Sequence, residues 1–186
     1  MNIFYLDKQP QQCAEQHCDK HVVKMILEYA QLLSTAHRVL DGNVCTGISK
    51  TGRKQTSYVL SDSRESTLYR ATHINHPSAA WVRQSAKNYH YLHLLLYYSC
   101  KEYTRRYGKV HKVERDDILG HLYAMPENIP QGTFTEPPPA MPDYCKVAGD
   151  SVASYRNYYI LEKNRFATWK TKAPDWYVEG VKRAAV

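Results

Sequence analysis

The stretch of sequence that decides the fold lies near the start of the chain and reads Cys13-Ala-Glu-Gln-His17-Cys18-Asp19-Lys20-His21-Val-Val-Lys24-Met-Ile-Leu-Glu28. Asp19 has a side chain suited to cap a helix, and apolar residues recur after it at helical spacing. We therefore predict a helix from Lys20 to about Arg38, with a turn or short helix over residues 13–18 before it.

This helix is predicted to have two unlike faces. Its buried face carries Val22, Ile26 and Leu33. The opposite arc carries the side chains with reactive chemistry, namely Cys13, His17, Lys20, His21, Lys24 and Glu28. A base, a cation and a carboxylate held in register are the parts from which an active site is built. The alternative is an ordinary solvated helix face, which has a similar composition.

Two further helices are expected later in the chain. A long one begins at Pro77 and ends before Gly108, because proline suits the first turn of a helix and glycine the residue after its end. The last one runs from Asp150 or Ser151 to about Trp169. The sequence thus predicts an all-α, mainly helical fold with about three main helices.

The remaining segments are predicted to be irregular. Residues 1–7 form a short extended segment that leads into the first helix. Residues 42–72 are rich in Ser, Thr, Gly, Lys and Arg, a composition that indicates a mobile basic loop. Residues 133–142 contain three consecutive prolines and predict an extended connection over the surface. With no repeat and no linker, residues 1–186 are expected to form a single compact domain with long loops.

Composition narrows the functional classes. The chain has 186 residues, 43% of them hydrophobic, and a formal net charge of +7. No apolar run approaches the roughly 20 residues of a membrane span, and the N-terminus does not resemble a signal peptide. The five cysteines are odd in number and irregularly spaced, so no disulfide framework is expected and a cytoplasmic location is predicted. The basic balance favours a polyanionic partner such as nucleic acid.

Two groups of residues are candidates for binding that partner. On the long second helix a basic stripe includes Arg83, Lys87, Lys101 and Arg105, and it continues into Lys109 and His111. Just before the same helix, His73, Asn75 and His76 can bind an anion together with the free backbone N–H groups of a helix N-terminus. The alternative for these three is helix capping and a buried histidine.

Two motifs in this chain resemble the endonuclease V type pyrimidine-dimer DNA glycosylases of phages and bacteria, which are small, basic, mainly helical proteins. The first is the turn Ala14-Glu15-Gln16-His17, followed by a helix that includes Lys24 and Glu28. The second is His76-Pro77-Ser…Trp81-Val-Arg83…Glu102-Tyr-Thr-Arg105-Arg106-Tyr107-Gly108. Together they cover about half of the chain. The sequence is also similar in character to uncharacterised bacteriophage proteins, which implies a host-cell cytoplasm.

The resemblance implies a DNA glycosylase, with or without AP-lyase activity, that acts on damaged or modified bases of double-stranded DNA as a monomer. A primary amine attacks the sugar C1′, and a glutamate on the first helix stabilises the cationic sugar. Glu28 is then the carboxylate, and the amine is that of Met1 or Lys24. His17 and His21 would position the phosphate or sugar. No metal and no cofactor are expected.

Two alternatives stay open at this point. The first is a nucleic-acid-binding module without catalysis, because a strict match of residues 14–17 to the family places Lys24, not Glu28, at the position of its glutamate. The second is a zinc protein that binds through Cys13, His17, Cys18 and His21. On a continuous helix Cys18 points about 100° away from His17, so this site requires a broken helix.

Overall fold

The computed structural model describes residues 1–48 and 51–185. It is mainly helical, as expected, with 54% of the structure in helices. The expectation of about three main helices was wrong, because the described residues form nine α-helices and a small two-stranded antiparallel sheet.

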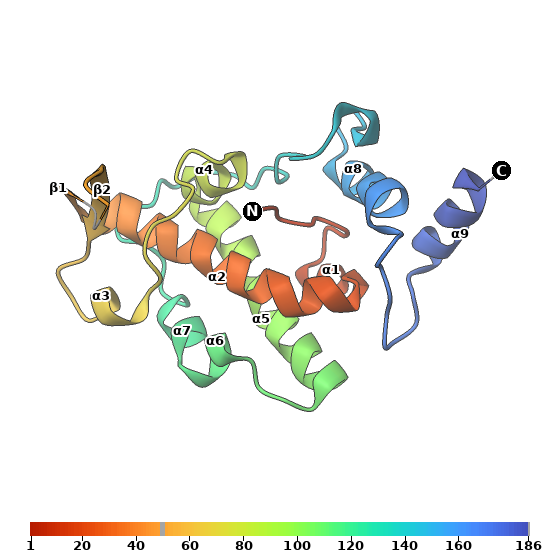
Figure 1. Ribbon diagram of the computed structural model, residues 1–186, viewed down its shortest axis with the longest axis horizontal. Coiled ribbons are helices and arrows are strands. Elements are labelled where there is room, and N and C mark those ends of the chain that lie inside the picture. Colours follow the sequence, from red (N-terminus) through yellow and green to blue (C-terminus); the bar gives the residue numbers. More distant parts are fainter. Residues whose placement is uncertain (49–50, 186) are drawn as a thin grey trace.

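The elements follow one another along the chain as shown in Figure 1. They are α1 (Pro10–Gln16), α2 (Asp19–Asp41), β1 (Asn43–Ile48), β2 (Lys54–Val59), α3 (Arg64–Thr67), α4 (Pro77–Gln84), α5 (Ala86–Tyr107), α6 (Lys112–Arg115), α7 (Ile118–His121), the 3₁₀ turn η1 (Asp143–Cys145), α8 (Ser151–Tyr158), the π turn η2 (Tyr159–Lys163) and α9 (Asp175–Ala184).

The long second helix predicted from the sequence is divided at Ser85. This residue has extended dihedral angles (φ −156°, ψ 153°), so α4 ends there and α5 begins. Its hydroxyl accepts a hydrogen bond from the backbone N–H of Asn88, as a helix cap does. The far end of α5 was predicted correctly, because Gly108 follows it with a left-handed φ of 63°.

Residues 42–72 are not an uninterrupted loop. β1 and β2 pair in register from Asn43 opposite Val59 to Ile48 opposite Lys54, and α3 follows. Residues 49 and 50, which belong to the segment predicted to be a loop, lie outside the described residues. Alternating polar and β-branched residues favour strand pairing here, a signal hidden by the overall polarity of the segment.

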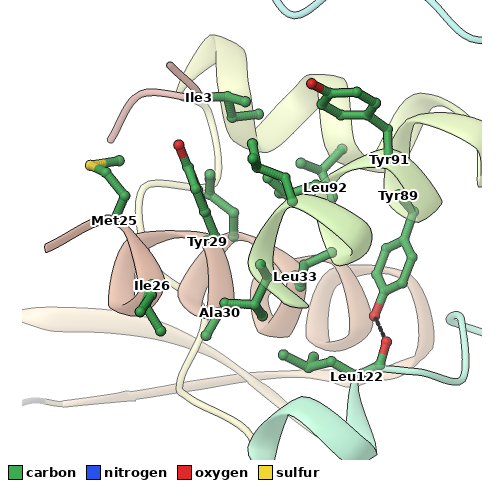
Figure 2. Packing of buried hydrophobic residues seen from close by; sticks show 14 of the residues in the cluster. Ile3, Met25, Ile26, Tyr29, Ala30, Leu33, Tyr89, Tyr91, Leu92 and Leu122 are labelled. Atoms are coloured by element: carbon green, nitrogen blue, oxygen red, sulfur yellow. Dashed lines mark hydrogen bonds between the residues drawn. The ribbon is translucent and has the colours of Figure 1, made fainter. Parts of the chain in front are cut away.

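The hydrophobic core lies where α2 and α5 cross, with the N-terminal segment packed beside them (Figure 1). Figure 2 shows side chains of α2 such as Tyr29 and Leu33 packed against Leu92 of α5. In the same view the hydroxyl of Tyr89 on α5 donates a hydrogen bond to the carbonyl of Leu122. The three residues predicted for the buried face of the first helix, Val22, Ile26 and Leu33, are all buried, which confirms that prediction.

An ionic cluster fixes the junction between α1 and α2. Arg106 on α5 has no exposed side-chain surface and pairs with Glu102 and Asp19. The same guanidinium donates to the backbone carbonyls of Glu15 in the last turn of α1 and of His17, the residue after α1. The carbonyls left free at the end of α1 are therefore satisfied by a buried cation.

The proline-rich segment 133–142 contains no helix or strand and is fastened along its length. The amide of Thr135 donates to Asn88 on α5, and the carbonyl of Ala140 accepts from the Asn2 side chain at 3.0 Å. The segment thus holds the N-terminal residues against the helices. Within residues 1–48 and 51–185, no helix is long and apolar enough to cross a membrane.

Candidate active site

A pocket of about 320 Å³ opens where the N-terminal segment, the first half of α2 and the C-terminal part of α8 and η2 meet. Four of the five predicted catalytic residues line it. The complete lining is Met1, Asn2, Phe4, Lys20, His21, Lys24, Met25, Glu28, Tyr158, Lys163 and Phe166.

The local sequence explains how α2 reaches this pocket. Lys20, Lys24 and Glu28 are each four residues apart, so they lie on one side of the helix. The extended N-terminal segment supplies the opposite wall, because alternate side chains of an extended chain point to opposite sides. Phe4 turns toward the pocket and stacks on His21 with ring centroids 4.1 Å apart, whereas Tyr5 packs on Tyr91 of α5.

The carboxylate of the pocket is Glu28. Its Oε1 lies 3.2 Å from Nζ of Lys24, one helical turn earlier. Glu28 is only 16% exposed, whereas Lys24 is 65% exposed. The carboxylate is therefore shielded from bulk water, and the lysine that balances its charge faces outward.

The amine of Met1 lies in the same pocket and close to the loop before α4. Burial, the positive charge of this amine and His73 lower the pKa of His76, while Glu28 raises it. His76 therefore lies within electrostatic reach of both proposed reactive groups. Its Nδ1 accepts a hydrogen bond from the backbone N–H of Ser78 at 3.1 Å, so in the neutral ring the other nitrogen carries the proton and can donate to an anion.

Two more lysines at the pocket lie over aromatic rings. Nζ of Lys163 lies 4.0 Å from the ring centre of Tyr158 and donates to its hydroxyl at 2.9 Å. Nζ of Lys20 lies 4.7 Å from the ring centre of Phe166. Each contact restrains a cation beside the pocket while leaving donor hydrogens for a ligand. With Lys24 and the Met1 amine, the pocket has four positive groups around one carboxylate.

His21 is a neutral member of this site. Its Nδ1 forms a hydrogen bond with the Tyr159 hydroxyl, and burial, with His17 and three nearby lysines, lowers its pKa to about 2. A histidine that is neutral at pH 7 is not a general acid here, but it can position a substrate. Its Nε2 makes no hydrogen bond to the part of the chain that is described and lies in the pocket wall.

His17 is the one predicted catalytic residue that lies elsewhere. It is buried beneath the N-terminal segment, where its ring nitrogens bond to the carbonyl of Cys13 (2.6 Å) and the hydroxyl of Tyr29 (2.8 Å). Burial lowers its pKa to about 4. Both nitrogens are thus used within the protein, and His17 serves the core.

The zinc hypothesis finds no site in this geometry, although the helix is broken before Asp19 as that hypothesis required. Cys13 is buried, donates to the carbonyl of Phe4, and has a pKa raised to about 11 by burial. Burial also raises the pKa of Cys18. No group of three or more His, Cys, Asp or Glu among the described residues is arranged to hold a metal ion.

The loop before α4 shows the helix capping that the sequence left open, whereas anion binding at this loop stays a prediction. His76 caps the helix, while His73 and Asn75 are exposed, and His73 has a left-handed φ of 49°. Arg83, predicted to bind substrate, instead donates to the carbonyls of Ile74 and Ala79 and so holds this loop on α4. Burial lowers its pKa.

The basic stripe predicted on the second helix does not converge on the pocket. Lys101 pairs with Glu114, and Arg105 pairs with Glu102, both near the far end of α5. His111 caps α6 by accepting from the amide of Val113. Lys87 and Lys109 are exposed at opposite ends of α5. These side chains are spread around the molecule, and several are already neutralised.

Sequence reasoning missed the wall of the pocket formed by Tyr158, Lys163 and Phe166. These residues lie more than 110 positions beyond the end of α2, where α8 ends early, at Tyr158, in a π turn. Only the basic and aromatic character of this segment was visible, without the packing that turns it toward the N-terminus.

In comparisons with known proteins, no family model, no curated protein and no solved structure matches this chain.

Proposed function

We propose that this protein is a DNA glycosylase for damaged or modified bases, in which Glu28 stabilises the cationic sugar and an amine of the same pocket attacks it. The observation that carries the proposal is the shared pocket of Glu28, Lys24 and Met1. A shielded carboxylate beside several amines is the combination that Schiff-base chemistry at a sugar requires.

The bonds change in a defined order. A neutral amine forms a bond to C1′, the glycosidic bond to the base breaks, and the base leaves with the bonding electrons and takes up a proton. The C1′–O4′ bond then breaks as one proton passes from the amine nitrogen to O4′, so that the sugar ring opens and an iminium forms. Glu28, only 16% exposed, lies where positive charge develops at the sugar, and its charge is little screened by water.

Met1 is the better nucleophile of the two candidates. Lys24 is already paired with Glu28 at 3.2 Å, and its side chain is 65% exposed. α-Amino groups as a class lose their proton at lower pH than lysine side chains. Lys20, Lys24 and Lys163 line the same pocket as Met1.

Borohydride trapping on DNA that contains an abasic site or a pyrimidine dimer tests the proposal. Reduction of the iminium would leave a covalent complex, and peptide mapping would place it on Met1, or on Lys24 if the second candidate attacks. Absence of a trapped complex on abasic, dimer and modified-base DNA would reject the mechanism.

The same experiment separates the proposal from a binding module without catalysis. Such a module would bind DNA with the usual dependence on salt. It would form no covalent complex, whereas a glycosylase would be trapped and would lose base release in the Glu28→Gln variant. The matched control is Glu179→Gln, which changes an exposed glutamate on α9.

A further inference from the structure

A line of positively charged and histidine side chains runs from the pocket to the β1–β2 hairpin. We call Lys24, His76, His73, Arg70 and Lys54 the α2 track, after the helix beside which they lie. Lys24 is on α2, Lys54 is on β2, and the other three lie in the loop of residues 68–76 or at its end. All but the half-buried His76 are exposed.

Hydrogen bonds fasten this loop along α2. Arg38 donates to the carbonyl of Tyr69 at 2.6 Å, near the hairpin end of the helix. One helical turn closer to the pocket, Thr35 and Thr72 exchange two hydrogen bonds. His76 then lies within electrostatic reach of Glu28. The loop therefore passes from the hairpin end of α2 to the pocket. Figure 1 shows the segment between α3 and α4 where it crosses α2.

The acidic side chains along this path are already neutralised. Arg38 pairs with Glu65 at 2.5 Å, and Arg64 pairs with Asp41 at 2.6 Å and Asp62 at 2.7 Å. Glu28 pairs with Lys24. Lys54 and Arg70, which take part in none of these pairs, give the path a surplus of positive charge toward a polyanion.

The hairpin extends beyond the end of α2 (Figure 1) and is exposed along both strands, with only Tyr58 partly buried. The described residues of the hairpin include the basic residues Arg53 and Lys54 and no acidic residue. A two-stranded ribbon fits the major groove of B-form DNA, and an isolated hairpin has little stability of its own without a surface to pack on.

We propose that duplex DNA lies along the α2 track, with the β1–β2 hairpin in its major groove. This inference rests on the proposed function for its choice of partner. The part of α2 from Lys24 to Asp41 is roughly 25 Å long at about 1.5 Å per residue. Because a duplex rises about 3.4 Å per base pair, the hairpin contacts the groove about seven base pairs or more from the nucleotide in the pocket.

Binding of an undamaged duplex tests the track without any dependence on catalysis. Lys54→Glu and Arg70→Glu should each lower the affinity roughly tenfold and make it less dependent on salt, because phosphate contacts are lost. Lys109→Glu makes the same charge change at the exposed end of α5 and should leave the affinity nearly unchanged. Equal loss in all three variants, or no loss at Lys54 and Arg70, overturns the proposal.

The hairpin contact has an independent test. Cys45 on β1 is exposed, and the other four cysteines are buried, so a photoactivatable group can be attached at Cys45 alone. It should cross-link to undamaged duplex DNA. The same group on a Tyr123→Cys, Cys45→Ser protein should not, because Tyr123 is exposed in the loop after α7. Absence of a cross-link from Cys45 contradicts the groove contact.

These outcomes separate the inference from the proposed function. If duplex binding is weakened in the Lys54 and Arg70 variants and borohydride trapping fails, the DNA path along the α2 track is supported and the glycosylase activity is rejected. Normal trapping with unchanged duplex binding would reject the track and retain the glycosylase. A protein that binds no duplex at all would overturn both.

Discussion

The Nδ1 atom of His21 lies 2.5 Å from the hydroxyl oxygen of Tyr159, although the two residues are 138 positions apart. This hydrogen bond joins α2 to η2 and so closes one wall of the pocket. Because the ring of His21 is stacked on Phe4 as well, all three segments that form the site meet at this histidine.

We expect stability to fall as the pH is lowered from 7 to 4. The pKa of His21 is lowered to about 2 and those of His17 and His37 to about 4, in each case chiefly by burial. Below the ordinary histidine pKa of about 6.5, the unfolded chain binds protons that the folded protein does not. The free energy of unfolding therefore decreases with falling pH, by up to about 1.4 kcal/mol per pH unit for each residue.

Urea denaturation at pH 7, 6 and 5 measures this effect. His21→Gln should reduce the slope by removing one of the three contributions. A free energy of unfolding that stays constant or rises between pH 7 and 5 would contradict the assignment of these histidines as buried and neutral.

Arg106→Met and Arg105→Met form a matched pair, because both arginines pair with Glu102. Arg106 has no exposed side-chain surface and also binds Asp19 and the backbone at the α1–α2 junction. Its loss should cost about 3–5 kcal/mol of unfolding free energy. Arg105 is 57% exposed, and its loss should cost at most about 1 kcal/mol.

Denaturant unfolding of the two variants checks this difference. Similar losses in both would mean that the pairing with Glu102 alone matters, and not the burial of Arg106 at the junction. The comparison matters for function, since the same junction sets the direction of α2 and hence of Glu28.

Residue spacing along the sequence predicted the positions of the helices better than it predicted how the helices pack together. The amphipathic spacing gave the buried face of α2, and Gly108 marked the end of α5, because both signals depend on near neighbours in the sequence. The break at Ser85 and the early end of α8 were not foreseen. In both cases packing against distant segments, such as the bond from Ser85 to the carbonyl of Thr133, competes with helix propensity.

The candidate site was predictable only on the side that α2 provides. Lys24, His21 and Glu28 share a face by helical periodicity, and they do line one pocket. His17 would share that face if the helix were continuous through it. The helix begins only at Asp19, however, and the His17 side chain is buried in the core. The wall from Tyr158 to Phe166 depends on contacts between segments that no local pattern encodes.

Lys24→Ala should retain covalent trapping, because Met1 is the proposed nucleophile. Removal of the ammonium leaves Glu28 without its partner at 3.2 Å but leaves the Met1 amine in place, so the rate of attack should change only modestly. Single-turnover rates with abasic DNA measure this change. Blocking the Met1 amine by acetylation should abolish trapping in both proteins. Retained trapping after acetylation, lost on Lys24→Ala, would assign the attack to Lys24.

Glu28→Gln should lower the rate of base release by about 10²–10³-fold, as the loss of one electrostatic group at a transition state does. The amide has nearly the same shape as the carboxylate but cannot balance the positive charge of the sugar. Its fold should be retained, since Glu28 lies at the edge of the pocket and pairs only with the exposed Lys24. Circular dichroism and duplex binding provide the controls, and both should match those of the parent. A variant that folds, binds DNA and releases the base at the parent rate would show that the charge of Glu28 takes no part in the reaction.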